Sequence, residues 1–245
     1  MKKYELTNET KTLAGGTVLH RIRALRDIPM FGVNAGELGG FVEEENNLSQ
    51  DGIAWVFDNA EVSGNAKVYG NAEVCGNAKV FGNAEIYGDA KVSDNAKVYG
   101  NAKVSGDAWV YDNAEIYGDA WVYGNAKVSG YAWVYGNARV YGNARVSGNA
   151  RVFGNAKVYG KAEIYGDAEI SGDADYMVIK NIWSSGRWFT YTSSNKKWAV
   201  GYFYGTGEEL VAKAYKDSKL SGKCYEAIVH AVETIEAAKA EAKAR

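Results

Sequence analysis

The apolar positions between Ala54 and Asp173 recur every six residues. Twenty consecutive hexapeptides have the general form Ala-x-Val/Ile-x-Gly/Asp-Asn/Asp, with no insertion. In an extended segment the Ala and the Val/Ile point to one side, and the residue between them points to the other. The apolar side therefore predicts the core. The Gly-Asn step predicts a corner, because these residue types accept a positive φ.

A strand and a corner every six residues predict a triangular coil of 18 residues. Successive coils would stack as parallel strands about 4.8 Å apart, so nearly seven coils would form a prism roughly 30 Å long. We therefore expect a mainly β protein built as a parallel β-helix over residues 54–175. A small N-terminal β cap with the first coil strands (1–53) would precede it, and a C-terminal α+β domain (176–245) would follow it.

Residues 18 apart should lie above one another on the outer surface, in three columns that follow the Val/Ile position. The first column contains Ser63, Phe81, Tyr99, Tyr117, Tyr135, Phe153 and Ser171. The second contains Tyr69, Tyr87, Ser105, Tyr123, Tyr141 and Tyr159. The third contains Phe57, Cys75, Ser93, Tyr111, Ser129, Ser147 and Tyr165. Two faces are therefore predicted to carry aromatic ladders, whereas the third is mostly small and polar.

The ladders have two interpretations. Aromatic neighbours on adjacent strands stabilise a sheet by a few tenths to about 1 kcal/mol per pair, which is a structural role. A continuous aromatic surface, joined by outward tryptophans, would instead mark a contact surface for a partner or for self-association. Under this second interpretation the contact residues are Tyr99, Tyr117, Tyr135, Trp109, Trp121 and Trp133.

The outward charges form runs in the sequence but not on the predicted surface. Arg139, Arg145 and Arg151 are six residues apart, so each lies on a different face, and we expect no basic patch from them. At the corners, Asp89 lies one coil before Asp107 and is a weak candidate for a cation site, since no third ligand accompanies it.

The two ends of the chain depart from the repeat. Strands are expected at Tyr4–Thr7 and Thr17–Leu25 with a turn at Gly15–Gly16, and Gly36–Val42 resembles a first coil strand. The eight-residue step from Leu48 to Val56 predicts one expanded corner.

After the repeat, three strands are expected at Met177–Ile182, Trp188–Thr192 and Lys197–Tyr204, with turns at Ser184–Gly186 and Ser193–Asn195. Thr206 and Glu209 form a capping-box pattern that opens a helix to about Asp217, and a second helix follows Gly222. The predicted sheet carries a candidate partner-binding cluster. Its members are Arg187, Tyr191, Lys197 and Tyr202.

The repeat resembles the hexapeptide-repeat family, in which a small residue stands two positions before an aliphatic one. This resemblance covers Ala54 to Asp173 and implies a left-handed parallel β-helix. The segment GELGGFV before GNAxV repeats, with a short C-terminal domain after them, is similar to phage and prophage hexapeptide-repeat proteins. In that domain the matching residues are Ser185, Arg187, Gly201, Phe203, Gly205, Thr206, Glu208 and Glu209. Members often have cysteines where this chain has Val200 and Tyr202, which argues against a thiol-dependent role.

The charge, cysteine and histidine content of the chain limits the partners and reactions that we expect. The net charge of −2 and the absence of a long apolar run argue against nucleic-acid and membrane partners, so we expect a soluble, cytoplasmic protein. The resemblance to phage proteins implies that this cytoplasm is that of a bacterial host cell. The two cysteines, Cys75 and Cys224, are expected to be reduced thiols. With only two histidines, one near each end, the chain offers no histidine base within the repeats for acyl transfer and no three-histidine zinc site. We expect no metal and no cofactor.

The preferred hypothesis is a non-catalytic phage or prophage accessory protein that acts as a binding or scaffolding module and engages a host protein or defence component. Its partner would be a protein or further copies of the chain, as a dimer or homotrimer. Two alternatives stay open. One is an acyl-CoA-dependent acyltransferase of the hexapeptide type, and the other is a protein that sequesters a small anionic ligand such as a signalling nucleotide.

Overall fold

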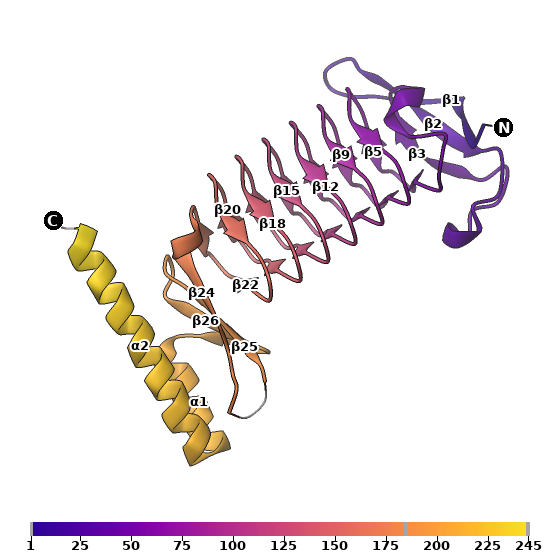
Figure 1. Cartoon of the computed structure of the whole chain (residues 1–245). Coiled ribbons are helices and arrows are strands. Elements are labelled where there is room, and N and C mark those ends of the chain that lie inside the picture. Colours follow the sequence, from indigo (N-terminus) through magenta and orange to yellow (C-terminus); the bar gives the residue numbers. More distant parts are fainter. Residues whose placement is uncertain (1, 184–185, 244–245) are drawn as a thin grey trace.

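The computed structural model describes residues 2–183 and 186–243. It shows an elongated molecule in which a prism of short strands lies between a β-rich N-terminal cap and a C-terminal module with two helices (Figure 1). The order of these three parts along the molecule follows their order in the sequence.

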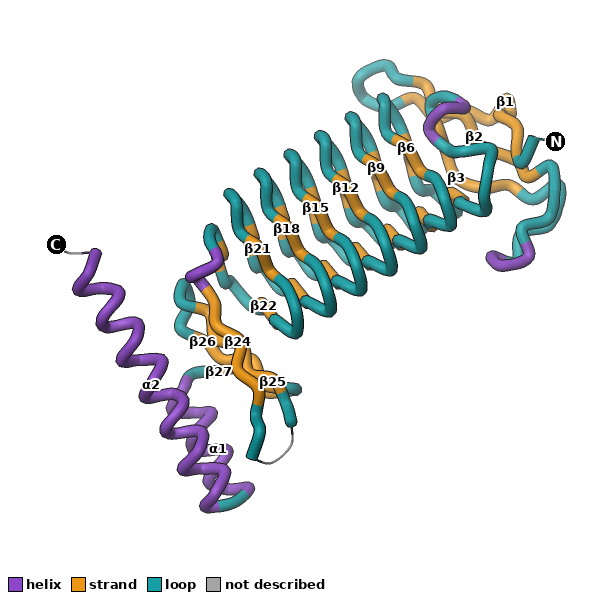
Figure 2. Tube along the Cα trace, in the orientation of Figure 1, coloured by secondary structure: helices purple, strands orange, loops and turns teal. Residues whose placement is uncertain are grey.

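The prism consists of three parallel sheets, which we call faces 1, 2 and 3, with two-residue strands separated by corners (Figure 2). Face 1 contains β5 (Glu61–Val62), β8 (Lys79–Val80), β11 (Lys97–Val98), β14 (Glu115–Ile116), β17 (Trp133–Val134), β20 (Arg151–Val152) and β23 (Glu169–Ile170). Face 2 contains β6 (Lys67–Val68), β9 (Glu85–Ile86), β12 (Lys103–Val104), β15 (Trp121–Val122), β18 (Arg139–Val140) and β21 (Lys157–Val158). Face 3 contains β4 (Trp55–Val56), β7 (Glu73–Val74), β10 (Lys91–Val92), β13 (Trp109–Val110), β16 (Lys127–Val128), β19 (Arg145–Val146) and β22 (Glu163–Ile164).

The strand register confirms the coil of 18 residues. Lys97 pairs with Glu115, and Val98 pairs with Ile116, in parallel orientation. Every repeat Ala and Val/Ile from Ala54 to Ile170 has no exposed surface, so the predicted inward positions form one continuous core. The fold is therefore a parallel β-helix of about seven turns. Its left-handedness stays a prediction from the family resemblance.

The corners depend on a left-handed backbone. Glycine occupies most of them, with φ between 64° and 75°. In one corner column Asp58, Asp94 and Asp112 take this conformation instead, with φ of 52°, 59° and 58°. The Asp112 carboxylate accepts the N–H of Gly130 in the next coil at 3.0 Å, and Asp58 accepts that of Gly76 at 3.0 Å. This bond compensates for the unfavourable φ of the aspartates.

The N-terminal cap joins the prism through its third strand. β1 (Tyr4–Thr12) and β2 (Val18–Ala24) are antiparallel, and β3 (Leu38–Val42) pairs with β2 on one side and with β5 on the other. The first strand is five residues longer than predicted. The expanded corner is confirmed, because Leu48 pairs with Val68 whereas Val56 pairs with Val74.

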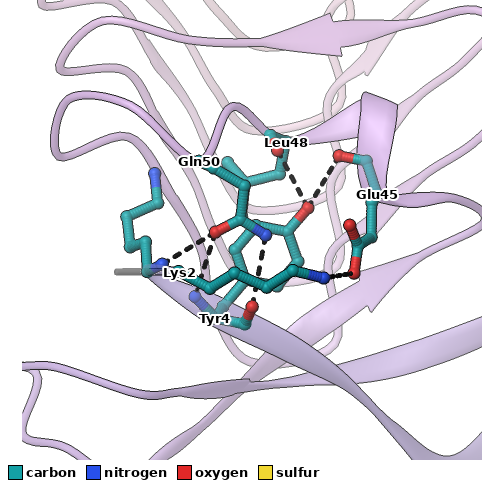
Figure 3. A network of polar contacts seen from close by, with 6 residues as sticks. Lys2, Tyr4, Glu45, Leu48 and Gln50 are labelled. Atoms are coloured by element: carbon teal, nitrogen blue, oxygen red, sulfur yellow. Dashed lines mark hydrogen bonds and ion pairs between the residues drawn. The ribbon is translucent and has the colours of Figure 1, made fainter.

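A polar network fixes the first strand to the start of the prism (Figure 3). The Tyr4 hydroxyl lies 2.8 Å from the carbonyl oxygens of Glu45 and Leu48. The Gln50 amide donates to the Tyr4 carbonyl at 3.2 Å and accepts from its N–H at 3.3 Å, while Lys2 forms an ion pair with Glu45 at 2.6 Å. These bonds satisfy backbone groups that the first coil would otherwise leave open.

Lys3 is fully buried beside this network, and its ammonium group donates to the Ala54 carbonyl at 2.7 Å. Burial, and after it the charge of Arg26, lowers the pKa of Lys3 from 10.5 to about 8. The unfolded chain therefore binds more protons than the folded one between these two pH values. The contribution of Lys3 to stability must rise with pH through this window.

We expect the free energy of unfolding of the wild type to increase by about 2 kcal/mol relative to Lys3→Met between pH 7 and pH 9.5. Urea unfolding of both proteins at the two pH values measures this. The Met variant keeps the length of the side chain but cannot titrate. A difference between the two proteins that does not change with pH would contradict the assigned pKa.

The C-terminal module is an antiparallel sheet of four strands with two helices. The strands are β24 (Tyr176–Lys180), β25 (Trp188–Thr192), β26 (Lys197–Val200) and β27 (Phe203–Gly205), in that order across the sheet. The prediction of three strands is wrong at the third, because Gly201 with φ of 59° turns the chain into a hairpin. The turn predicted at Ser184–Gly186 involves Ser184 and Ser185, which lie outside the described residues.

The helices are α1 (Gly207–Asp217) and α2 (Lys219–Lys243). The capping box is confirmed, since the Glu209 N–H donates to the Thr206 hydroxyl at 3.2 Å and the Thr206 N–H donates to the Glu209 carboxylate at 2.8 Å. The second helix begins before Gly222, not after it. A side chain at Gly222 would meet the ring of Tyr215 at 2.2 Å, so this glycine permits close helix packing and does not end a helix.

The helices pack on the sheet through a second core that contains Leu210, Val229 and Val232 of the helices together with Phe189 and Trp198 of the sheet. Near its end, α2 also reaches the last coil, where Lys239 donates to the Ala174 carbonyl at 2.9 Å. Neither of the described helices is long and apolar enough to cross a membrane.

The module also closes the open end of the prism. One backbone N–H of the last strand on each face donates to a side-chain oxygen. These pairs are Glu163 N to Thr190 Oγ1 at 2.9 Å, Glu169 N to Ser194 Oγ at 2.8 Å, and Lys157 N to Asp173 Oδ1 at 3.0 Å. The last strands are therefore not free edges on which another chain could add a strand.

Candidate functional site

The two aromatic columns form stacked ladders, as predicted. On face 1 the rings of Phe81, Tyr99, Tyr117, Tyr135 and Phe153 follow one another with centroids 4.8–5.3 Å apart. On face 2 the successive pairs are Tyr69 with Tyr87, Tyr123 with Tyr141, and Tyr141 with Tyr159, at 4.9–5.3 Å. Most of these rings are half-buried by their own neighbours. This stacking supports the structural interpretation of the ladders.

A diagonal relation that the 18-residue columns do not reveal connects neighbouring coils. The outward residue between Ala and Val/Ile contacts the column residue 16 positions earlier. The Trp109 indole donates to Ser93 at 3.3 Å, and the Trp121 indole donates to Ser105 at 3.1 Å. Ser105 interrupts the ladder of face 2, and it does so where the indole of Trp121 covers it. Serines in a ladder are therefore sites where another side chain lies across the rung.

The three outward tryptophans do not join one aromatic surface. Trp133 lies on face 1, Trp121 on face 2 and Trp109 on face 3, because they are 12 residues apart in a coil of 18. The expectation of a continuous surface joined by all three is therefore wrong. Only Trp133 is exposed, and the guanidinium of Arg151 lies 5.1 Å from its ring.

Face 3 differs from the others because it twice has two rungs in succession without a ring, at Cys75 and Ser93 and again at Ser129 and Ser147. The first gap is covered in part by Trp109, which donates to Ser93. Tyr111 precedes the second gap and Tyr165 follows it, with side chains of Lys127 and Arg145 alongside. Together these residues line a hollow of about 210 Å³, which we call the notch. Ser129 is only 8% exposed, whereas Ser147 is half-buried, so the open rung of the notch is that of Ser147.

A second hollow of about 300 Å³ lies next to the notch, where face 3 meets the C-terminal module. We call it the cationic groove. It shares Lys127 and Arg145 with the notch and adds Lys161, Glu163, Arg187 and Trp188. Four cationic residues therefore line the groove, against one carboxylate.

The members of this site come from separate elements. Lys127 and Arg145 are register partners on β16 and β19, so the arginine and lysine runs do produce a basic pair within one face. The expectation that these residues form no patch is correct for residues six apart, but it overlooked this pair at a spacing of 18. Lys161 stands at a corner that is Asn or Asp in most repeats, and this departure is the signal that sequence reasoning missed.

The charges in the groove act on one another. The pKa of Glu163 is raised, chiefly by burial, although Arg145 acts to lower it. Burial and then the charge of Glu163 raise the pKa of the Tyr165 hydroxyl, which is within hydrogen-bonding reach of Arg145. Tyr204 of the C-terminal module packs edge-on against Tyr165 at 6.2 Å and donates to its carbonyl at 3.1 Å. The far wall of the notch is thus held by the module.

The predicted C-terminal cluster is only partly brought together. Arg187 and Tyr202 line one hollow, and Tyr202 is fully exposed at the hairpin turn. Tyr191 is buried against Trp198, with ring centroids 5.0 Å apart, so its ring belongs to the core of the module. Lys197 lies at the opposite end of the hairpin, opposite Thr192. Of the four, only Arg187 lines the cationic groove.

Other candidates are placed away from this site. Asp89 accepts from Asn71 at 3.0 Å in a corner ladder, and no group of three or more metal-binding side chains occurs in residues 2–183 and 186–243. Both cysteines are free thiols, and burial raises the pKa of Cys75 to about 12, which makes it a poor nucleophile. His20 lies in the cap, and His230 is exposed on α2.

Three overlapping stretches of the prism, residues 132–146, 138–152 and 144–160, match the family described as YdcK Beta solenoid repeat. The chain is a β-helix repeat protein. The matched stretches include Arg145 and Ser147 of the notch, but the solenoid as a whole is much longer than they are. No curated protein matches the chain.

Proposed function

We propose that the chain is a non-catalytic binding protein that holds an anionic partner in the cationic groove of face 3. The observation that carries this proposal is the convergence of Lys127, Arg145, Lys161 and Arg187 on one hollow between the β-helix and the C-terminal module. On the other two faces the aromatic side chains stack on one another. The β-helix then serves as a rigid support for Lys127, Arg145 and Lys161.

Two features support a binding role over acyl transfer. Neither His20 nor His230 lines the notch or the groove, so neither hollow has a histidine base for activating an acceptor. The GELGGFV segment and the GNAxV repeats support a place among phage and prophage accessory proteins, acting in the cytoplasm of a bacterial host. Acyl transfer is the competing proposal.

The groove predicts which charge reversals abolish binding. We expect the immobilised wild-type chain to retain an anionic component of a bacterial lysate. The double variant Lys127→Glu/Arg145→Glu should retain at least about 10-fold less of it, because each charge-assisted bond contributes about 1.5–3 kcal/mol. Elution with salt, followed by mass spectrometry, measures the retained component. Turnover of acetyl-coenzyme A measured on the same protein tests acyl transfer.

The matched control is Arg139→Glu/Lys157→Glu. These two residues are also register partners, both exposed, on face 2. The change in net charge is identical, so the control should retain the component as the wild type does. Equal retention by all three proteins, equal loss in both variants, or acetyl-coenzyme A turnover would contradict the proposal.

A further inference from the structure

We propose that the ligand of this site is a small organic phosphate that carries a planar ring, with its phosphate in the cationic groove and its ring in the notch. This inference rests on the proposed function and specifies the ligand. It follows from the side-by-side position of two unlike hollows that share Lys127 and Arg145.

The notch suits a planar ring for a reason internal to the fold. Most rungs on faces 1 and 2 are filled by rings that stack at 4.8–5.3 Å, whereas the rung of Ser147 on face 3 has no ring and is only half-buried. The walls are Tyr111 on one side and Tyr165 on the other. A ring that enters the notch would continue the ladder, and offset stacking of such rings is favourable.

The groove suits a phosphate. Phosphate oxygens accept several charge-assisted hydrogen bonds, and guanidinium groups match their geometry. Arg145 and Lys127 line both hollows, so they would bind at the link between ring and phosphate, whereas Lys161 and Arg187 line only the groove. Glu163 is the one carboxylate in the groove. Its negative charge repels a phosphate, so it favours the orientation in which the phosphate lies against the cationic side chains.

Both aromatic walls of the notch are held by neighbouring side chains. The ammonium of Lys127 lies 5.1 Å from the Trp109 ring, and the Trp109 ring lies 4.8 Å from that of Tyr111. At the other end Tyr204 holds Tyr165. Because both walls have supporting partners, the notch is preformed, which lowers the entropic cost of binding.

Isothermal titration of the full chain tests the ligand class with three probes. Adenosine monophosphate has both parts, ribose 5-phosphate lacks the base, and adenosine lacks the phosphate. We expect adenosine monophosphate to bind with a dissociation constant below about 1 mM. Ribose 5-phosphate should bind about 10-fold more weakly, and adenosine should not bind measurably.

A Ser147→Tyr variant separates the ring from the phosphate. It places in the notch the residue that the sister columns carry, so the β-helix tolerates it, and it fills one open rung. We expect adenosine monophosphate to bind this variant no better than ribose 5-phosphate does, while ribose 5-phosphate binds as it does to the wild type. Lys127→Glu/Arg145→Glu should lose both ligands, and Arg139→Glu/Lys157→Glu should lose neither.

The outcomes separate this inference from the proposed function. If no probe binds, or if Ser147→Tyr leaves the binding of adenosine monophosphate unchanged, the ligand class is wrong. The proposed function still stands in that case if lysate retention depends on Lys127 and Arg145. Binding of adenosine alone as tightly as adenosine monophosphate would also overturn the inference, since the cations would then have no role.

Discussion

Val140→Asp is expected to unfold the β-helix. Val140 is fully buried, and its register partners Val122 and Val158 belong to the same apolar column. A carboxyl group there has no hydrogen-bond partner and must either stay charged in an apolar core or bind a proton. Either course costs at least about 4 kcal/mol, which is a large part of the roughly 5–15 kcal/mol by which a typical domain is stable. Circular dichroism during thermal unfolding measures the loss.

The matched control for this variant is Arg139→Asp, one residue earlier on the same strand. Arg139 is exposed and points away from the core, so the same new side chain should lower the melting temperature only slightly. If the two variants melted alike, the inward and outward assignment of this strand would be wrong.

Gly148→Ala should have the second largest effect. Gly148 has a φ of 75°, and a Cβ atom added there would lie 2.9 Å from the backbone N of Gly166 in the next coil. The new methyl group therefore meets rigid backbone in addition to the strain of a left-handed alanine, which alone costs about 1–2 kcal/mol. We expect a total loss of about 3 kcal/mol in the free energy of unfolding, measured with urea.

Gly160→Ala separates strain from crowding. Gly160 has a φ of 69°, but it lies in the last coil and a Cβ atom there would have no neighbour within 4 Å. It should cost only the strain, about 1–2 kcal/mol. Equal losses at Gly148 and Gly160 would show that coil-to-coil contact at the corners contributes nothing.

The sequence was sufficient for the β-helix because its pattern is local and repeated. Inward Ala and Val/Ile positions, left-handed corners and the stacking of residues 18 apart all follow from the spacing of six. The expanded corner between Leu48 and Val56 could be read in the same way, since an eight-residue step must displace the register.

The candidate site could be predicted only in part. The small third column was visible, but the significance of Ser129 and Ser147 depends on side chains that cross between coils, and the 18-residue columns do not show that diagonal. Lys161 was not recognised, although it departs from the Asn or Asp found at most corners. Arg187 and Trp188 reach the groove because the C-terminal sheet packs against the end of face 3, a tertiary contact that no local pattern encodes.

Two errors in the prediction of the C-terminal module also have specific causes. Gly222 looked like a helix start, and its role is contact with Tyr215. Tyr191 was assigned to a partner-binding cluster, but the helices cover its side of the sheet and bury it. In both cases a contact with another element decided the environment of the residue.

Photo-crosslinking from two exposed corners tests the central claim most directly. A photoreactive amino acid at Asn143 would lie on the rim of the cationic groove, whereas one at Asn155 would lie on an exposed corner between faces 1 and 2. The account predicts that the component retained from lysate crosslinks to the chain from position 143 and not from position 155. Crosslinks from position 155 alone, or equally from both, would contradict the assignment of binding to face 3.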